Sequence, residues 1–222
     1  MSSTPAAIFW DMDGTLIDTE PLWGEATYAL SEELGRRITP EVRELTVGGS
    51  FDNTLRILAE YAGLSLVDVN VNHYRTFMFN RMAQLFEGGI DLNPGVGGVL
   101  ESLAAAGTPM YVTTNTERVL ADRCIDAMGR HFFTDSITGD EVANPKPAPD
   151  MYLEAARRAS AEPEECLVFE DSWAGMTAAV DAGCVVLGLA EDVPACVHRF
   201  NPANFEGAIA ADVVGWYADA VG

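Results

Sequence analysis

The sequence is poor in positive charge, and above all in lysine. It has 13 lysines and arginines against 34 aspartates and glutamates, a formal net charge of -21, and Lys146 is its single lysine. A protein that binds nucleic acid or an anionic membrane surface needs a basic patch. The composition therefore argues against both partners. An anionic small molecule would have to be bound by a local cation or a metal, against the overall field.

Long hydrophobic runs and cysteine motifs are also missing. No stretch reaches the roughly 18 apolar residues of a membrane-spanning helix, and the first residues lack the pattern of a signal peptide. The cysteines form no metal-binding spacing, and they are Cys124, Cys166, Cys184 and Cys196. Cys166 and Cys184 lie in apolar segments, where a reduced, buried thiol is expected. We therefore expect a cytoplasmic protein and, because no long exposed apolar seam is evident, a monomer.

What the sequence does contain is an alternation of short apolar segments with helical periodicity. The apolar segments have the length of buried strands and lie at residues 6–10, 110–114, 136–138, 166–170 and 185–189. Helices are expected at 96–106, 117–128, 150–159 and 174–182, with a helix-like end at 213–222. This order is typical of repeated βαβ units. It predicts an α/β fold with a Rossmann-like open parallel sheet.

Residues 19–92 differ from the rest, because helical periodicity continues there without strand-like alternation. Helices are expected at 22–34, 55–62 and 69–85, with a Gly-rich loop at 46–53 (TVGGSFDN). The segment EGGIDLNPG, at 87–95, is typical of a linker. We predict a core domain formed by residues 1–18 and 93–222 and an inserted all-helical cap domain at 19–92. The cap is expected to open and close about its two connections to the core.

Several predicted strands end in residues that can bind metal or phosphate. In IFWDMDGTLID, Asp11 and Asp13 follow the first strand, and side chains two residues apart project to the same side. Thr114 ends the second strand, and Glu170 and Asp171 end the strand at 166–170. Ligands of open α/β sheets bind at the carboxyl ends of the strands. We therefore expect these side chains to converge on one site.

The lone lysine adds a cation to this group. Lys146 lies in NPKPAPD, where prolines on both sides restrict the backbone. Clustered carboxylates suit Mg²⁺, which together with Lys146 and Thr114 could neutralise a phosphoryl group. Asp11 is then available as a nucleophile and Asp13 as a general acid and base. Asn115 either assists phosphate binding or caps the following helix.

Four segments, in this order, resemble the motifs of the haloacid dehalogenase superfamily. DMDGTLID, at 11–18, resembles the first motif, and Thr114 at the end of an apolar strand resembles the second. Lys146 in NPKPAPD resembles the third, and VFEDSWAG, at 168–175, the fourth. The helical insertion resembles the cap domain of that family. The resemblance implies magnesium-dependent chemistry on a phosphate ester.

The resemblance also implies a role for each matching residue. Asp11 would attack phosphorus and become an aspartyl phosphate, while Asp13 would protonate the leaving group and later activate water. Mg²⁺ would be bound by Asp11, the backbone carbonyl of Asp13 and Asp171, with Glu170 as an outer or alternative ligand. The groups that would hold the phosphoryl oxygens are Thr114, Lys146 and the backbone N–H groups near Met12 and Asn115.

Individual residues separate the branches of this superfamily. The dehalogenase branch lacks the second acid of the first motif, whereas Asp13 is present here, and a phosphonate hydrolase needs a cap lysine that this chain lacks. The insertion resembles that of the β-phosphoglucomutase-like branch. There a mutase carries a histidine and an arginine at the positions of Trp23 and Phe51. The sequence therefore predicts a phosphatase; a hexose phosphate mutase and a catalytically idle binding protein on the same fold are the alternatives.

The cap is expected to choose the substrate, a small phosphorylated metabolite such as a sugar or polyol phosphate. Glu20, Trp23, Ser50 and Phe51 are candidates for lining the pocket from this side. Simple helix packing or loop solvation is the alternative for each of them.

Overall fold

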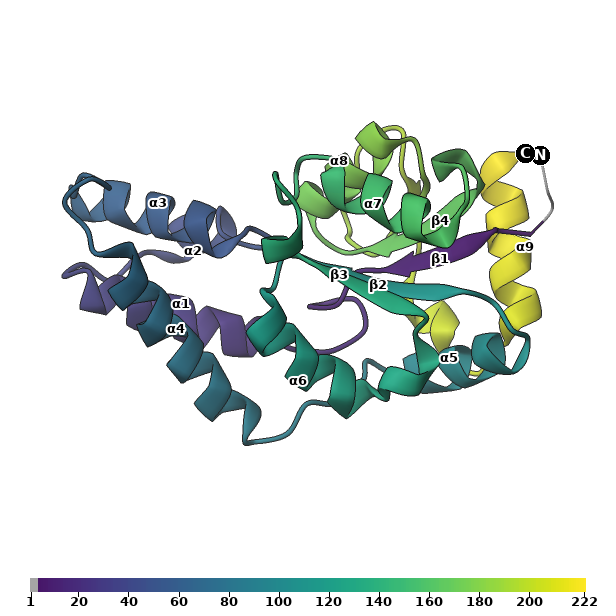
Figure 1. The fold of residues 1–222 in the computed structure, drawn as a ribbon, viewed down its shortest axis with the longest axis horizontal. Helices are drawn as coiled ribbons and strands as arrows, with labels where there is room; N and C mark the ends of the chain where they lie inside the picture. Colours follow the sequence, from purple (N-terminus) through teal and green to yellow (C-terminus); the bar gives the residue numbers. More distant parts are fainter. Residues whose placement is uncertain (1–3) are drawn as a thin grey trace.

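Six parallel strands form the centre of the structure, a computed structural model that describes residues 4–222. Their order across the sheet is β3-β2-β1-β4-β5-β6 (Figure 1). The strands are β1 (Ala7–Trp10), β2 (Met110–Thr114), β3 (Asp135–Thr138), β4 (Cys166–Glu170), β5 (Val185–Gly188) and β6 (His198–Arg199). Each neighbouring pair in this sheet is parallel. The prediction of a Rossmann-like α/β core is therefore confirmed.

Helices cover both faces of this sheet, which explains why its central strand is apolar without interruption. Ile8 and Trp10 of β1 pack into one cluster, whereas Ala7 and Phe9 pack into the other. The first cluster includes residues of α5 (Val96–Ala105), α6 (Arg118–Met128) and α9 (Ala210–Val221). The second includes residues of α7 (Asp150–Ala159) and α8 (Trp173–Ala182). Successive side chains of a strand point to opposite faces, so a sheet covered twice needs apolar residues at every position.

The remaining helices lie together beyond the ends of the strands (Figure 1). They are α1 (Glu20–Glu33), α2 (Pro40–Glu44), α3 (Phe51–Ala62) and α4 (Val71–Phe86). The two connections to the core lie side by side, because the Asn93 N–H donates to the Leu16 carbonyl at 2.9 Å. The Asn93 side chain also donates to the Gly14 and Thr15 carbonyls. This arrangement supports the proposed division into a core and a cap.

Four local features differ from the sequence-based expectations. The cap contains α2, whose five residues are too few to show a helical period. The core sheet ends in β6, whose two residues, paired with β5, are too few to show a strand pattern. Helix α3 begins at Phe51, inside the predicted loop, because Ser50 caps it. Cys166 is buried as expected, but Cys184 is only half-buried, since it lies in the turn between α8 and β5. Over residues 4–222, no helix combines the length and apolar character needed to cross a membrane.

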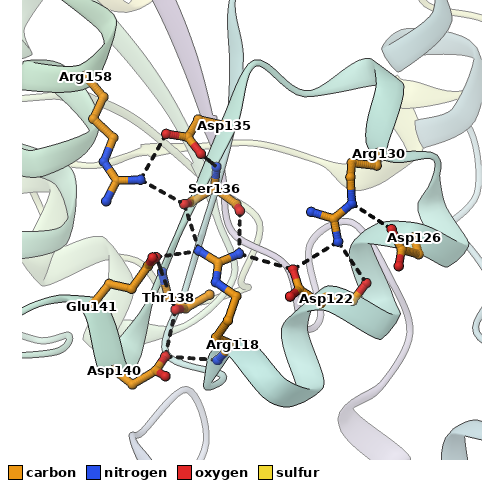
Figure 2. A network of polar contacts seen from close by, with 10 residues as sticks. All are labelled: Arg118, Asp122, Asp126, Arg130, Asp135, Ser136, Thr138, Asp140, Glu141 and Arg158. Carbon is orange, nitrogen blue, oxygen red and sulfur yellow. Dashed lines mark hydrogen bonds and ion pairs between the residues drawn. The ribbon is translucent and has the colours of Figure 1, made fainter.

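The edge strand β3 is covered by a network of charged side chains (Figure 2). The Ser136 carbonyl accepts hydrogen bonds from Arg118 at 3.0 Å and from Arg158 at 3.3 Å. Arg118 also pairs with Glu141, which in turn accepts the N–H of Thr138. Charged side chains along an edge discourage pairing with a second molecule. The network also ties β3 to α7 through Arg158, and the loop after β3 to α6 through Arg118. This loop leads to Lys146.

Candidate active site

The carboxyl ends of three neighbouring strands carry the centre of the site. Asp11 follows β1, Thr113 lies near the end of β2, and Glu170 ends β4. The Lys146 ammonium reaches all three, donating to Asp11 Oδ1 at 2.7 Å, Glu170 Oε1 at 2.6 Å and the Thr113 carbonyl at 2.9 Å. The structure thus brings together residues that lie up to 159 positions apart in the chain.

Burial and neighbouring charges determine the protonation of this centre. Burial opposes the charge of Lys146, but the carboxylates of Asp11 and Glu170 outweigh it and hold the pKa of the ammonium well above its usual value. Burial, followed by repulsion from Glu170, raises the pKa of Asp11 well above its usual value, and Lys146 offsets this only in part. Lys146 therefore stays charged. A further cation beside the surrounding acids would stabilise their ionised forms.

Glu170 is fully buried and holds Lys146 in place. Its Oε1 accepts from Lys146 and from the Tyr152 hydroxyl at 2.9 Å. Its Oε2 accepts from the Ser172 N–H at 3.1 Å and the Ser172 hydroxyl at 3.0 Å. A Cβ on Gly175 would lie 1.6 Å from this carboxylate, so only glycine fits there. Sequence reasoning missed Tyr152, because nothing in its spacing from Lys146 indicates a shared partner.

The acidic residues of this centre fit a divalent cation. Asp11, Glu170 and Asp171 offer oxygens that all lie within 4.8 Å of one another. Burial, Glu170 and Glu20 raise the pKa of Asp171 well above its usual value. Three carboxylates against one ammonium leave an excess of two negative charges, which Mg²⁺ would neutralise through the oxygen ligands that it prefers. Because both oxygens of Glu170 already accept hydrogen bonds, Asp11 and Asp171 are the better candidates for direct ligands.

Asp13 lies at the junction between the core and the cap. Its Oδ1 accepts from the Thr19 hydroxyl at 2.6 Å and from the Trp23 indole N–H at 2.7 Å. Its Oδ2 accepts from the Thr116 hydroxyl at 2.7 Å and more weakly from Thr114 at 3.3 Å. Donors from both sides of the cleft therefore fix the orientation of this carboxylate. The sequence indicated no partnership of Asp13 with Thr19, Trp23 or Thr116.

Asn115 does not cap the following helix, so that interpretation was wrong. The N-cap residue of α6 is Glu117. The Asn115 amide instead accepts from the Lys146 N–H at 2.9 Å and donates to the Lys146 carbonyl at 3.0 Å and the Gly48 carbonyl at 2.9 Å. Within the described chain, the backbone N–H groups of Met12 and Asn115 have no hydrogen-bond partner. Free N–H groups beside Asp11 are suited to binding phosphoryl oxygens.

A pocket lies between this edge of the core and the cap. Glu20, Trp23 and Phe51 line it, as expected. Ser50 does not line it, because its hydroxyl points to the start of α3 and accepts the Asn53 N–H at 3.3 Å. The other residues that line the cap side are Thr27, Arg43, Thr46, Val47, Gly48, Gly49, Thr54, Met78 and Phe79.

The arginines around this pocket are paired with acids. Arg43 donates to Glu20 Oε2 at 2.8 Å and to the Thr46 hydroxyl at 3.0 Å. Arg75 of α4 stacks over the Phe51 ring at 4.4 Å and pairs with Glu117 of the core. Sequence reasoning missed both arginines, because neither belongs to a motif. The Arg75–Glu117 pair and the Asn115–Gly48 contact hold the cap against the core.

Comparison with known proteins places the chain in a family. A model of the haloacid dehalogenase-like hydrolase family matches residues 5–183. The phosphorylated carbohydrates phosphatase of Thermotoga maritima is 31% identical over 196 residues, which cover 88% of this chain and 87% of that protein. The fructose-1-phosphate phosphatase YqaB of Escherichia coli is 30% identical over 179 residues, covering 80% and 93%. The chain therefore belongs to the haloacid dehalogenase-like hydrolases.

Solved structures agree with this assignment. CbbY from Rhodobacter sphaeroides, in complex with xylulose-1,5-bisphosphate, has a TM-score of 0.73 at 28% identity, over 83% of this chain and 85% of that chain. A β-phosphoglucomutase from Clostridium difficile has a TM-score of 0.84 over 97% of both chains; at 18% identity it shares the fold. Within its family, the chain lies in the branch of phosphoric monoester hydrolases that includes the sugar phosphatases.

Proposed function

We propose that this hydrolase is a magnesium-dependent phosphatase that acts on a small phosphate monoester, a sugar or polyol phosphate, through an aspartyl-phosphate intermediate. One observation carries the proposal: the buried ammonium of Lys146 lies between Asp11 and Glu170, at the edge of the sheet where the four motifs meet. The names of two relatives, phosphatases of phosphorylated carbohydrates and of fructose 1-phosphate, support the substrate class.

The reacting groups would act in two steps. Asp11 Oδ2, which accepts no hydrogen bond within the described chain, attacks phosphorus and the bond to the leaving oxygen breaks. Asp13 gives that oxygen a proton. A water molecule then attacks the phosphorus of the aspartyl phosphate, Asp13 accepts the water proton, and inorganic phosphate leaves.

The remaining groups would bind and orient the phosphate. Lys146 and the free N–H groups of Met12 and Asn115 hold its oxygens, and Thr114 lines the same pocket. Mg²⁺, held by Asp11, the Asp13 carbonyl and Asp171, would neutralise negative charge on the phosphoryl group and the acids around it. The hydrogen bond from Trp23 to Asp13, and Phe51 in place of a cation, favour the phosphatase over a mutase.

The direct test is release of phosphate from p-nitrophenyl phosphate with and without Mg²⁺. Asp11→Asn should abolish the activity, a loss of about 10⁴-fold or more, as expected when a nucleophile is removed. Asp219→Asn is the matched control, because Asp219 is exposed on α9, at the end of the core away from the cap (Figure 1). Activity that survives in Asp11→Asn contradicts the assignment of Asp11 as the nucleophile. Activity that a chelator does not affect contradicts the proposed dependence on a metal. A wild-type chain with no activity favours the idle binding protein.

Two further properties stay predictions from the sequence. The cytoplasmic location and the monomeric state rest on the composition and the apolar pattern alone. Gel filtration coupled to light scattering tests the monomer directly.

A further inference from the structure

The pocket extends from the phosphoryl site toward the cap, and five acids line it. Asp11, Asp13 and Asp171 line its core end, where the phosphoryl group and the metal would be bound, whereas Glu20 and Glu117 are the acids of the space beyond. Arg43 is the single base among the residues described as lining it. A substrate enters this pocket with its leaving group toward the cap, because the phosphoryl group is held at the core edge. The charge of the cap side therefore decides which leaving groups fit.

Arg43 exposes little of its charge to a ligand, although its Nε has no hydrogen-bond partner within the described chain. Its side chain is 9% exposed, whereas that of Glu20, its partner, is 30% exposed. The carboxylate rather than the guanidinium is thus the accessible part of the pair. Glu20 Oε2 accepts from Arg43, while no hydrogen bond within the described chain uses Oε1. Glu20 therefore presents a free acceptor to the pocket.

The next cation on this side is also engaged. Arg75 lies over Phe51 and is held by Asp52 at 2.7 Å and by Glu117. What faces the pocket at this point is the Phe51 ring, next to Phe79 at 5.8 Å between ring centroids. Met78 and Trp23 extend this apolar wall. Aromatic and thioether surfaces of this kind pack against the C–H faces of a neutral molecule.

We infer that this site selects phosphate monoesters whose leaving group is uncharged and bears hydroxyls, and that it rejects bisphosphates and phosphorylated acids. The inference rests on the proposed phosphatase function and narrows its substrate class. A hydroxyl donates to Glu20 Oε1, whereas a second phosphate or a carboxylate meets like charge with no unpaired cation to offset it.

Two pairs of substrates test this selection. Sorbitol 6-phosphate and 6-phosphogluconate share one carbon chain and differ in a terminal CH₂OH or carboxylate. Fructose 1-phosphate and fructose 1,6-bisphosphate differ in a second phosphate. For each pair we expect kcat/KM of the charged ester to be about tenfold lower or more, since one like-charge contact suffices for such a factor.

The outcomes separate this inference from the proposed function. Charged esters hydrolysed as well as their neutral partners would overturn the inference and leave the phosphatase intact. Hydrolysis of p-nitrophenyl phosphate but of none of the sugar esters would overturn the requirement for hydroxyls. No hydrolysis of p-nitrophenyl phosphate would overturn the proposed function itself, and the inference with it.

Glu20→Gln tests whether Glu20 causes the preference for esters with an uncharged leaving group. It keeps the shape and the bond from Arg43 but removes the negative charge, so the preference for neutral esters should fall by about tenfold. Glu20→Asp should largely restore the preference. Glu60→Gln is the matched control, because Glu60 is an exposed cap glutamate whose partner is Arg56. A preference unchanged in Glu20→Gln, or equally reduced in Glu60→Gln, would contradict the role of Glu20.

Discussion

The two sides of the active-site pocket are built in different ways. On the core side, Asp11, Lys146 and Glu170 are buried at the ends of strands or in a loop stiffened by prolines, and their distances are 2.6–2.7 Å. On the cap side, aromatic rings from three helices and one neutralised arginine from a fourth line the space. The core side holds charges at fixed positions for chemistry, whereas the cap side offers surface for selection. Substitutions on the core side and on the cap side should therefore change activity by different amounts and in different kinetic constants.

The largest loss of activity is expected when the cation of the core side is removed. Lys146→Met leaves Asp11 and Glu170 buried without a cation, so kcat should fall by about 10³-fold. Thermal stability should fall as well, by about 3–5 kcal/mol, because a buried ion pair loses one partner. Steady-state kinetics and thermal melting measure the two effects. Arg123→Met is the control, since Arg123 is exposed on α6; a similar loss there would show that net charge, not position, matters.

The second-largest effect is expected where the cap contacts the core. Gly48 has φ +67°, and a Cβ there would lie 2.5 Å from the Ser172 side chain of the core. Gly48→Ala should prevent the cap from settling on the core and lower kcat/KM by about 10²-fold. Gly63→Ala is the matched control, because Gly63 lies in the same cap with φ +75° and nothing within 4 Å. Equal losses of kcat/KM in both variants would mean that backbone strain alone causes the defect.

A smaller effect should follow from the link between the cap and Asp13. Trp23→Phe keeps the ring but removes the N–H that donates to Asp13. We expect about a tenfold fall in kcat/KM for an alkyl phosphate, the value of one charged hydrogen bond. The fall should be smaller for p-nitrophenyl phosphate, whose leaving group needs little protonation. Trp173→Phe makes the same change at an exposed position and should alter neither value. Equal falls for both esters in Trp23→Phe would assign Trp23 to substrate packing rather than to positioning Asp13.

The smallest effect is expected at the rim of the pocket. Arg75 of the cap and Glu117 of the core form a partly exposed ion pair. Arg75→Gln should raise KM by about two- to threefold at low salt, the range of an exposed pair, and this difference should disappear at high salt. Measuring KM at two ionic strengths checks it. Arg56→Gln, which breaks a pair within α3, is the control. A salt-independent rise would point to the stacking of Arg75 on Phe51 instead.

The sequence was informative about the core for a physical reason. Parallel strands bring their carboxyl ends to one edge, so residues that end or follow strands, such as Asp11, Thr114 and Asp171, can be placed together without a structure. Lys146 could be added because it is the single lysine and lies between prolines. The resemblance to one family then supplied their roles.

The cap was less accessible to such reasoning, because its pocket forms from side chains on helices whose mutual angles the sequence does not reveal. Arg43 and Arg75 were missed for this reason. Ser50 was assigned to the pocket, although a serine before a helical segment is also an N-cap signal. The four hydrogen bonds of Asp13 join three separate segments and have no counterpart in any spacing rule.

The scarcity of lysine has a practical consequence. Lys146 carries the single side-chain primary amine of the sequence, and amine-reactive labels attack only accessible, neutral amines. In the folded protein its burial and its ion pairs with Asp11 and Glu170 shield it from such a label. A covalent mark on this side chain would therefore accumulate only as fast as the catalytic centre opens. Timed labelling in native buffer, read by mass spectrometry, would report the rate and free energy of that opening without denaturant.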